Sequence, residues 1–323
     1  IAEGVDQTRG WFYTLHAIGT MVFDSVAYKN VVSNGLVLDK NGQKMSKRLG
    51  NAVDPFENLS KYGADATRWY MIANANPWDN LKFDEAGIEE VKRKFFGTLY
   101  NTYSFFAMYS NLDKFKYSEA DIPLDERHEI DRWILSELHT LIQKVDEYYG
   151  DYEPTKAARA ISFFTQEYLS NWFVRLSRRR FWKGDYQKDK ISAYQTLCTC
   201  MLTIAKLGAP IAPFFMDKLY KDLTSVTQKE NFESVHLAEF PKYDSNCIDK
   251  SLERKMENAQ KISSLVLSLR AKEKIKVRQP LRKIMIPIDS KEQKNEILAV
   301  SDLIKHEVNV KDIELLEDAS DIL

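Results

Sequence analysis

The chain has 323 residues, of which 44% are hydrophobic and 12% aromatic, so it can bury a core and form two or three domains. The formal net charge is only −1, which excludes overall charge as an indication of a nucleic-acid partner. Three cysteines exclude a disulfide framework and a four-cysteine zinc site, and we expect no metal site. No signal peptide or membrane-spanning stretch is apparent, so we expect a cytoplasmic protein without a membrane partner.

Residues 1–83 have the pattern of a mixed α/β domain with too few strands to be complete. A polar opening precedes a helical stretch at residues 11–25, and VVSNGLVL at residues 31–38 is typical of a strand. The following Asn-Gly predicts a tight turn with a positive φ angle. Pro55 favours the start of the next helix. We interpret this segment as the C-terminal part of an α/β domain and expect a fragment of a longer protein.

Long amphipathic helices are predicted from residue 84 to about residue 272, because apolar residues recur there at helical spacing. Pro154 and Pro213 lie where helices should begin. The predicted apolar stripes are Ile134, Leu138, Leu141, Ile142 and Val145; Ala157, Ile161, Thr165, Tyr168 and Trp172; Ile191, Tyr194, Cys198, Met201 and Ala205; and Leu252, Met256, Ala259, Leu265, Val266 and Leu269. This pattern predicts an antiparallel helical bundle. Residues 273–323 predict a small α+β segment in which KIMIPI and VKDIELL form short strands around a helix.

Residues 41–51, NGQKMSKRLGN, form a compact cationic segment without apolar periodicity. Lys44, Lys47 and Arg48 lie within five positions around Ser46, and glycines stand on both sides. Glycine allows such a loop to bend at both ends. A lysine-rich loop is usually only a solvated surface loop, so its function depends on the rest of the chain.

Two further segments concentrate positive charge. Residues 172–190 hold seven Lys or Arg against two Asp, and residues 270–283 hold seven against one Glu. Such clusters indicate a phosphate-bearing partner, although solvated helix faces with salt bridges remain an alternative. The candidate RNA contacts are Arg175, Arg178, Arg179, Arg180, Lys183, Lys274, Lys276 and Arg278. For Trp172, which lies among them, we favour a place in the core.

Several of these segments together resemble the class I aminoacyl-tRNA synthetases, and specifically the isoleucyl-tRNA synthetase family. KMSKR at residues 44–48 resembles the second signature of that class, and AEGVDQTRGWFYTL at residues 2–15 resembles the isoleucyl pattern. LSNWFVRLSRRRFW at residues 169–182 and IKVRQPL at residues 275–281 are similar to its anticodon-binding domain. Arg48, in place of a second serine, resembles the eukaryote-like branch, which also occurs in some bacteria.

The resemblance implies a three-part organisation and an activity. Residues 1–83 would be the C-terminal remnant of a Rossmann-type catalytic domain, residues 84–272 the helical anticodon-binding domain, and residues 273–323 a truncated α+β segment. The implied reaction is the ATP-dependent activation of isoleucine to its adenylate and transfer to tRNA(Ile). The first signature of the class is missing, so we expect the segment alone to be inactive. A valyl or leucyl relative, or a non-catalytic tRNA-binding scaffold, stays open as an alternative.

The same resemblance implies roles for individual residues. Lys44, Ser46 and Lys47 would be catalytic, and Lys44, Met45 and Lys47 would bind ATP with its Mg²⁺. The wall of the adenylate site would comprise Glu3, Gly4, Asp6, Gln7 and Trp11. The alternative is that Glu3 and Asp6 only cap a loop end and that Trp11 is a core residue. Asp65 and Arg68 would support the loop. We expect a monomer whose partners are ATP, isoleucine and tRNA(Ile), with zinc only in segments outside this chain.

Overall fold

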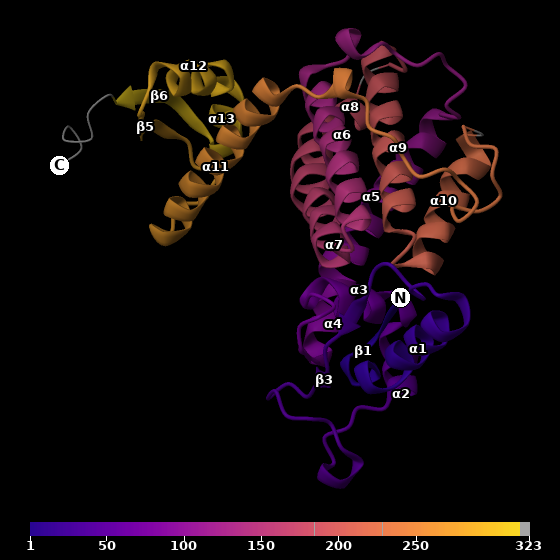
Figure 1. Ribbon diagram of the computed structural model, residues 1–323. Coiled ribbons are helices and arrows are strands. Elements are labelled where there is room, and N and C mark those ends of the chain that lie inside the picture. The colour runs from indigo at the N-terminus through magenta and orange to yellow at the C-terminus, as the bar shows by residue number, and fades with distance from the viewer. Residues whose placement is uncertain (184, 228, 317–323) are drawn as a thin grey trace. The chain divides into compact units, whose positions relative to one another are not determined.

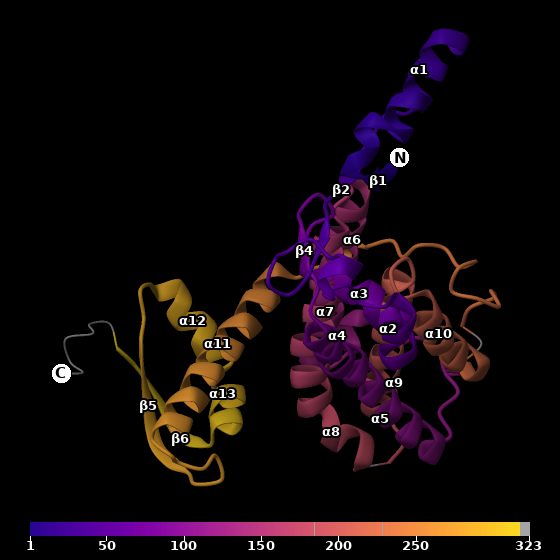
Figure 2. The same cartoon turned by 90° about the horizontal axis from the view of Figure 1, so that it is seen from below.

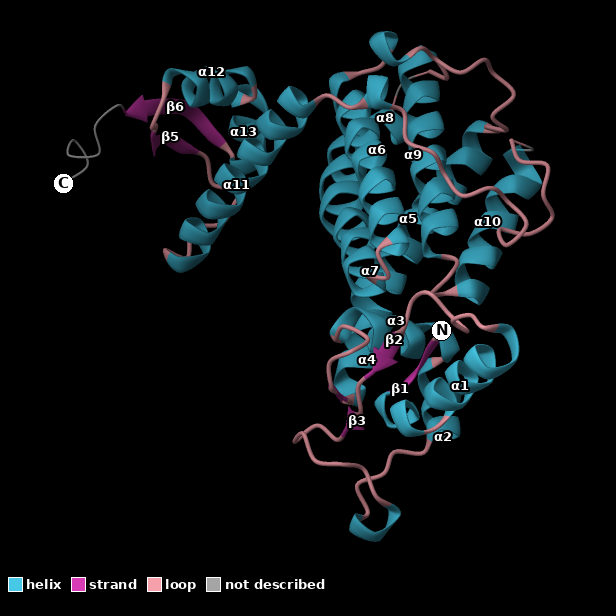
Figure 3. Cartoon of the chain, viewed as in Figure 1, coloured by secondary structure: helices cyan, strands magenta, loops and turns pink. Residues whose placement is uncertain are grey.

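The computed structural model describes residues 1–183, 185–227 and 229–316. The described residues are mostly helical with small sheets (Figures 1 and 3). The chain divides into two compact units, Ile1–Ser245 and Asn246–Leu323. None of the helices in the described ranges is both long and apolar enough to cross a bilayer.

The first unit begins with two small parallel sheets. β1 (Ala2–Gly4) pairs with β2 (Val32–Asn34), and β3 (Val37–Leu38) pairs with β4 (Leu81–Lys82). The strand predicted at residues 31–38 is thus split at Gly35. A Cβ atom there would lie 2.3 Å from the backbone oxygen of Asp79, so this close approach of two backbones requires glycine.

Helices connect these strands. They are η1 (Val5–Arg9), α1 (Trp11–Phe23), η2 (Lys47–Leu49), α2 (Pro55–Tyr62) and α3 (Ala64–Asn74). Figure 2 shows α1 extending away from the helices of this unit, and apolar side chains such as Met21 and Phe23 are exposed on it. The predicted start of a helix at Pro55 is confirmed, because Asp54 caps α2 by accepting hydrogen bonds from the amides of Phe56 and Glu57.

The rest of the first unit is helical. Its elements are α4 (Glu85–Val91), η3 (Lys92–Phe96), α5 (Gly97–Asp113), η4 (Leu124–Glu126), α6 (Glu129–Gly150), α7 (Pro154–Phe163), η5 (Phe164–Val174), α8 (Arg175–Trp182), α9 (Lys188–Gly208) and α10 (Pro213–Thr227). Figure 1 shows α5, α6, α7 and α9 side by side, in agreement with their contacts. The predicted helix starts at Pro154 and Pro213 are confirmed. The π-helical form of η3 and η5 was not predicted.

The core of the helical part contains most of the predicted stripes. Ile134, Leu138 and Val145 on α6 are at most 1% exposed, and Cys198 on α9 is fully buried. Trp172, which we expected to be a core residue, is 8% exposed. The helical periodicity in the sequence therefore identified the buried faces of these helices correctly.

The second unit contains a parallel strand pair and three helices in its described part. The elements are α11 (Lys250–Lys272), β5 (Leu281–Pro287), α12 (Lys291–Ala299), α13 (Ser301–Val308) and β6 (Val310–Leu316); the turn η6 (Ser245–Cys247) lies at the boundary of the units. β5 pairs with β6 from Leu281↔Val310 onward. The two predicted strands are confirmed, and two helices rather than one connect them. Residues 317–323 of the predicted segment lie outside the described residues.

Helix α11 differs from its prediction. It packs against α12 and α13 in the second unit, so the boundary between compact units falls at residues 245/246 and not near residue 272. Leu265 and Leu269 are 66% and 61% exposed, so the stripe predicted through them is wrong in its C-terminal half. The buried face instead continues through Ser263 and Arg270, which follow Met256 at multiples of seven, whereas the two leucines lie off that face.

Candidate functional site

Both candidate segments leave the carboxyl ends of parallel strands. Residues 5–11 follow β1, and the cationic segment follows β3. The carboxyl ends of parallel strands in α/β proteins are where ligands bind. β1 and β3 belong to different two-stranded sheets, so their pairing alone does not bring the two segments together. Figure 1 shows the segment between β3 and α2 projecting away from the packed elements. We call residues 39–54 the cationic loop.

The base of the cationic loop is closed by Asp39 and Asn51. The Oδ1 atom of Asp39 accepts hydrogen bonds from the amides of Asn41 (2.9 Å) and Gln43 (2.8 Å), and its Oδ2 atom accepts one from Asn51 Nδ2 (2.9 Å). The Gln43 amide and the Asn51 side chain hold the pKa of Asp39 below its ordinary value, because both donate to the carboxylate. The two ends of the loop are therefore tied together.

Sequence reasoning missed Asp39 and Asn51. A local signal was present for Asp39, since an aspartate two residues before an Asn-Gly turn commonly accepts hydrogen bonds from the turn amides. No local signal identifies Asn51 as its partner, because the two are twelve positions apart.

Ser46 and two glycines shape the tip of the loop. The amide of Ser46 donates to Asn51 Oδ1 (2.9 Å), and the hydroxyl of Ser46 accepts from the Arg48 amide (3.1 Å). Gly42 and Gly50 have φ angles of +84° and +67°, a region that glycine occupies without strain. Both polar groups of Ser46 are thus engaged within the loop and help to hold its shape.

Lys44 and Lys47 are exposed on this loop. Within residues 1–183, 185–227 and 229–316, neither ammonium group takes part in an ion pair. Two cations thus stand on the loop after β3 without an ion-pairing carboxylate among the described residues. Such an arrangement suits an anionic ligand.

The residues after β1 form a separate polar group. Gln7 Nε2 donates to Asp6 Oδ2 (2.9 Å), while Gln7 Oε1 accepts from the Trp11 amide (3.0 Å) at the start of α1. Trp11 is 51% exposed, so the alternative that it is a core residue is wrong. Glu3 is exposed, and Gly4 flanks η1 without a side-chain cap. In the described part of the chain, no hydrogen bond joins this group to the cationic loop.

The predicted RNA contacts on α8 have different surroundings. Arg178, Arg179 and Lys183 are exposed, and the guanidinium of Arg175 lies 5.8 Å from the Trp172 ring centroid. The side chain of Arg180, only 13% exposed, points inward and pairs with the fully buried Asp131 at 2.7 Å. Arg180 therefore connects α8 to α6. We remove it from the candidate RNA surface, because its guanidinium is engaged inside the protein.

The second basic segment is an exposed loop between α11 and β5. Lys274, Lys276 and Arg278 are all exposed there. Arg270, which is 3% exposed, donates to the carbonyl oxygens of Gln279 (3.0 Å) and Asn309 (2.9 Å). A buried guanidinium thus holds the loop on which the exposed cations stand. Among the residues that the structure describes, no group of three or more His, Cys, Asp or Glu is arranged to hold a metal ion.

Two family models match the chain. Residues 1–84 match tRNA synthetases class I (I, L, M and V), and residues 131–285 match the anticodon-binding domain of tRNA ligase. The first match contains the cationic loop and the group after β1, and the second contains α8 and the loop before β5. The chain therefore belongs to the class I tRNA synthetases.

Within that class the chain is similar to isoleucine–tRNA ligases. It is 66% identical over 323 residues to that of Bacteroides thetaiotaomicron, 64% to that of Cytophaga hutchinsonii and 42% to that of Thermus thermophilus. These matches cover all of this chain but only 28%, 29% and 31% of the respective relatives. The chain thus spans less than a third of their length.

A solved structure shows a related fold. It is a LeuRS of Agrobacterium radiobacter K84, determined in a ternary complex with tRNA and LeuAMS, with a TM-score of 0.53 and 19% sequence identity. The likeness covers 74% of this chain and 28% of that one. At this identity it supports the fold alone.

Proposed function

We propose that this chain is the part of an isoleucine–tRNA ligase that supplies the cationic loop to the ATP site and binds tRNA(Ile). The observation that carries the proposal is the pair of exposed, unneutralised lysines, Lys44 and Lys47, on a loop closed by Asp39 and Asn51. The similarity to isoleucine–tRNA ligases along the whole chain supports isoleucine as the amino acid. It also disfavours a valyl or leucyl relative.

In such a reaction the amino-acid carboxylate attacks the α-phosphorus of ATP, and pyrophosphate leaves. Negative charge grows on the transferring group and on the leaving pyrophosphate, so positioned cations lower the barrier. Lys44 and Lys47 would place their ammonium groups against these oxygens, and Mg²⁺ bound to ATP would supply further positive charge. Met45 would lie beside the nucleotide between them. Gly42 and Gly50 would allow the loop to approach ATP and to withdraw for product release.

The group after β1 would form the opposite wall of the site. Glu3 would attract the substrate ammonium, and Asp6 and Gln7 would hydrogen-bond polar groups of the adenylate, for example the ribose. The exposed ring of Trp11 would provide an apolar face for the isoleucine side chain. An apolar pocket distinguishes isoleucine from valine by only about 1–3 kcal/mol, so the complete enzyme would require a separate editing site.

The helical part would bind tRNA. We propose an antiparallel bundle formed by α5 to α10 as the anticodon-binding domain, with Arg175, Arg178, Arg179 and Lys183 facing the phosphates. Lys274, Lys276 and Arg278, in the second compact unit, would contact tRNA phosphates through a surface of their own. By function we propose to divide the chain at residues 83 and 272, although α11 packs within the second compact unit. Phosphate contacts of this kind position an RNA, whereas base contacts specify it.

A non-catalytic tRNA-binding scaffold is the main alternative from another class of protein. It has no use for two unneutralised lysines on a loop with glycine hinges, and both lysines are present. The catalytic proposal therefore accounts for more of the observed geometry.

The proposal is tested by Lys47→Ala in the full-length protein that contains this chain. We expect amino-acid-dependent pyrophosphate exchange to slow by roughly 100- to 1,000-fold, the usual effect of removing one transition-state donor. Isoleucine binding should change little, because Lys47 contacts only the developing phosphate charge. Lys218→Ala, which removes an exposed ion pair on α10, is the control and should leave exchange unchanged. An unaltered exchange rate in Lys47→Ala would remove the loop from the mechanism.

A further inference from the structure

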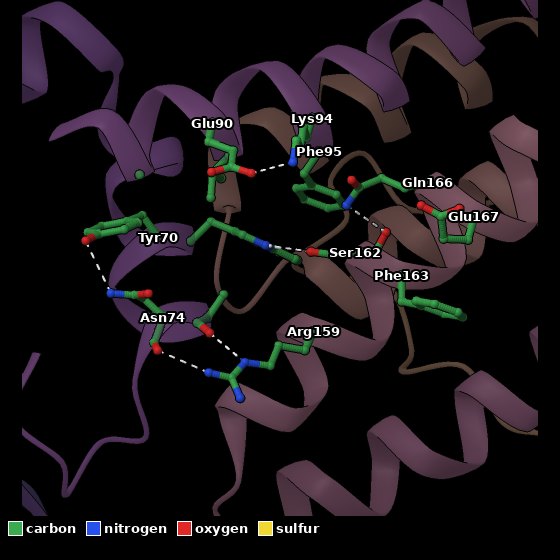
Figure 4. Close-up of a pocket in the computed structure, with 14 residues that line it drawn as sticks. Tyr70, Asn74, Glu90, Lys94, Phe95, Arg159, Ser162, Phe163, Gln166 and Glu167 are labelled. Atoms are coloured by element: carbon green, nitrogen blue, oxygen red, sulfur yellow. Dashed lines mark hydrogen bonds and ion pairs between the residues drawn. The ribbon is translucent and has the colours of Figure 1, made fainter. Parts of the chain in front are cut away.

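The cationic loop is followed by α2, which begins at Pro55, and α3 begins nine residues after Pro55. The C-terminal end of α3 is held by α7. The single hydroxyl hydrogen of Thr155 is shared between the carbonyl oxygens of Ile72 and Ala75, which lie 2.7 and 3.0 Å from its oxygen. Arg159 donates from Nε to Ala73 (2.7 Å) and from Nη2 to Asn74 (3.1 Å). Figure 4 shows Arg159 reaching these carbonyls. The free carbonyls at this helix end are thus satisfied from another helix.

The N-terminal end of α3 is held by α10. Asp65 accepts a hydrogen bond from the amide of Phe215 (2.6 Å) in the first turn of α10, and it forms an ion pair with Arg68. Arg68 Nε donates to the carbonyl oxygen of Ile211 (3.2 Å), and its guanidinium lies 5.3 Å from the Phe214 ring centroid. Asp65 therefore caps α10, which lies about 150 positions later, and not α3.

One face of α3 lines a cavity of about 360 Å³ beneath the cationic loop. Thr67, Arg68 and Met71 contribute from α3, and Met45 and Val53 contribute from the loop. Met45 directly follows Lys44 and lies two positions before Lys47, and it is half-buried whereas both lysines are exposed. Arg68 also contacts Ile211, just before α10, and Phe214 in its first turn.

We propose that Asp65 and Arg68 are positioning residues. They fix α3 against the helical part of the first unit, and α3 in turn fixes the position of the cationic loop. Because α3 is held at both ends, it cannot shift or rotate without breaking contacts to α7 or α10. Its remaining face then presents a fixed cavity wall to Met45, and the position of Met45 places Lys44 and Lys47. That this loop position matters for ATP binding rests on the proposed function. That α3 fixes the loop position does not.

The link is tested in the full-length protein by hydrogen–deuterium exchange of peptides covering residues 41–53. Arg68→Ala should raise their exchange rate by at least about twofold, the lower range for mutations that alter coupling between sites. Arg68→Lys should give an intermediate result, since lysine keeps the charge but loses the planar fork. Thr155→Val, at the other end of α3, should act in the same direction. Lys61→Ala, which removes an exposed ion pair between α2 and α4, is the control and should leave the loop unchanged.

A kinetic readout distinguishes positioning from simple loss of structure. In pyrophosphate exchange, Arg68→Ala should raise the KM for ATP more than it lowers kcat, with the KM for isoleucine little changed. The inference is overturned if Arg68→Ala speeds hydrogen–deuterium exchange only in the first turn of α10 and leaves that of residues 41–53 unchanged. Asp65 and Arg68 would then be structural residues only. If Lys47→Ala leaves adenylate formation intact, the proposed function fails. The hydrogen–deuterium exchange experiment still decides whether α3 fixes the position of the cationic loop.

Discussion

At the scale of single residues, neighbouring arginines of α8 have opposite environments. Arg178 and Arg179 are exposed, whereas Arg180 pairs through both terminal nitrogens with Asp131, each at 2.7 Å. Ser192 Oγ also donates to Asp131 (2.6 Å). A buried carboxylate lowers the stability of the fold unless it is paired. Arg180 therefore neutralises Asp131 in addition to joining α8 to α6.

This difference predicts two separable phenotypes. Arg180→Ala should lower the free energy of unfolding by about 3–5 kcal/mol, because it leaves Asp131 buried without its partner. Arg178→Ala should change it by no more than about 0.5 kcal/mol, as is usual for an exposed position. Urea unfolding followed by circular dichroism measures both values. Equal losses in the two variants would show that Arg180 is not the structural residue described above.

At the scale of elements, the segment before the second unit is attached to α6 through His139. The Nδ1 atom of His139 accepts a hydrogen bond from the Asp244 amide (3.0 Å), which requires a neutral ring. Burial lowers the pKa of His139, and the nearby charge of Asp244 opposes this only in part.

A pH dependence follows from this contact. Because the folded-state pKa is below the unfolded value of about 6.5, the contribution of His139 is present above that pH and is lost as the pH falls through the folded pKa. We expect the Tm of the wild type to fall between about pH 7 and pH 5 by more than that of His139→Gln, which keeps an acceptor but does not titrate. Calorimetry at a series of pH values compares the two. Identical pH profiles would contradict the assignment.

At the scale of the whole molecule, a net charge of −1 coexists with exposed cations gathered at residues 175–183 and 274–278. The proposed binding to tRNA should then depend on local charge and weaken steeply with added salt, because each phosphate contact releases a counterion. The net charge alone would predict no attraction.

We therefore predict that Arg178→Ala combined with Arg179→Ala reduces the slope of log K against log salt concentration for tRNA by about 0.7–0.9 per lost phosphate contact. Filter binding over a salt series measures the slope. Lys218→Ala is again the matched control, since its ammonium is already paired with Asp222. An unchanged slope in the double variant would place the RNA surface elsewhere.

Much of the fold was predictable from the sequence, because the determinants are local. Pro55, Pro154 and Pro213 each begin a helix, because proline lacks an N–H group and is tolerated only in the first turn. The glycines of the cationic loop adopt positive φ angles because they have no Cβ atom. Apolar spacing identified the buried faces of α6, α7 and α9 for the same reason. The motif KMSKR at residues 44–48 and the match to isoleucine–tRNA ligases also depend only on the order of residues.

The sequence by itself thus determined most of the helices, the strand regions near residues 31–38, 283–288 and 310–316, the family and the cationic loop. Only the tertiary structure decided that Arg180 faces Asp131, that Trp11 is exposed, that α11 turns Arg270 inward, and that Asp65 caps α10. The physical reason is the same in each case. Local conformation depends on neighbouring residues, whereas burial and the choice of a charged or hydrogen-bonding partner depend on residues brought together from positions far apart in the chain.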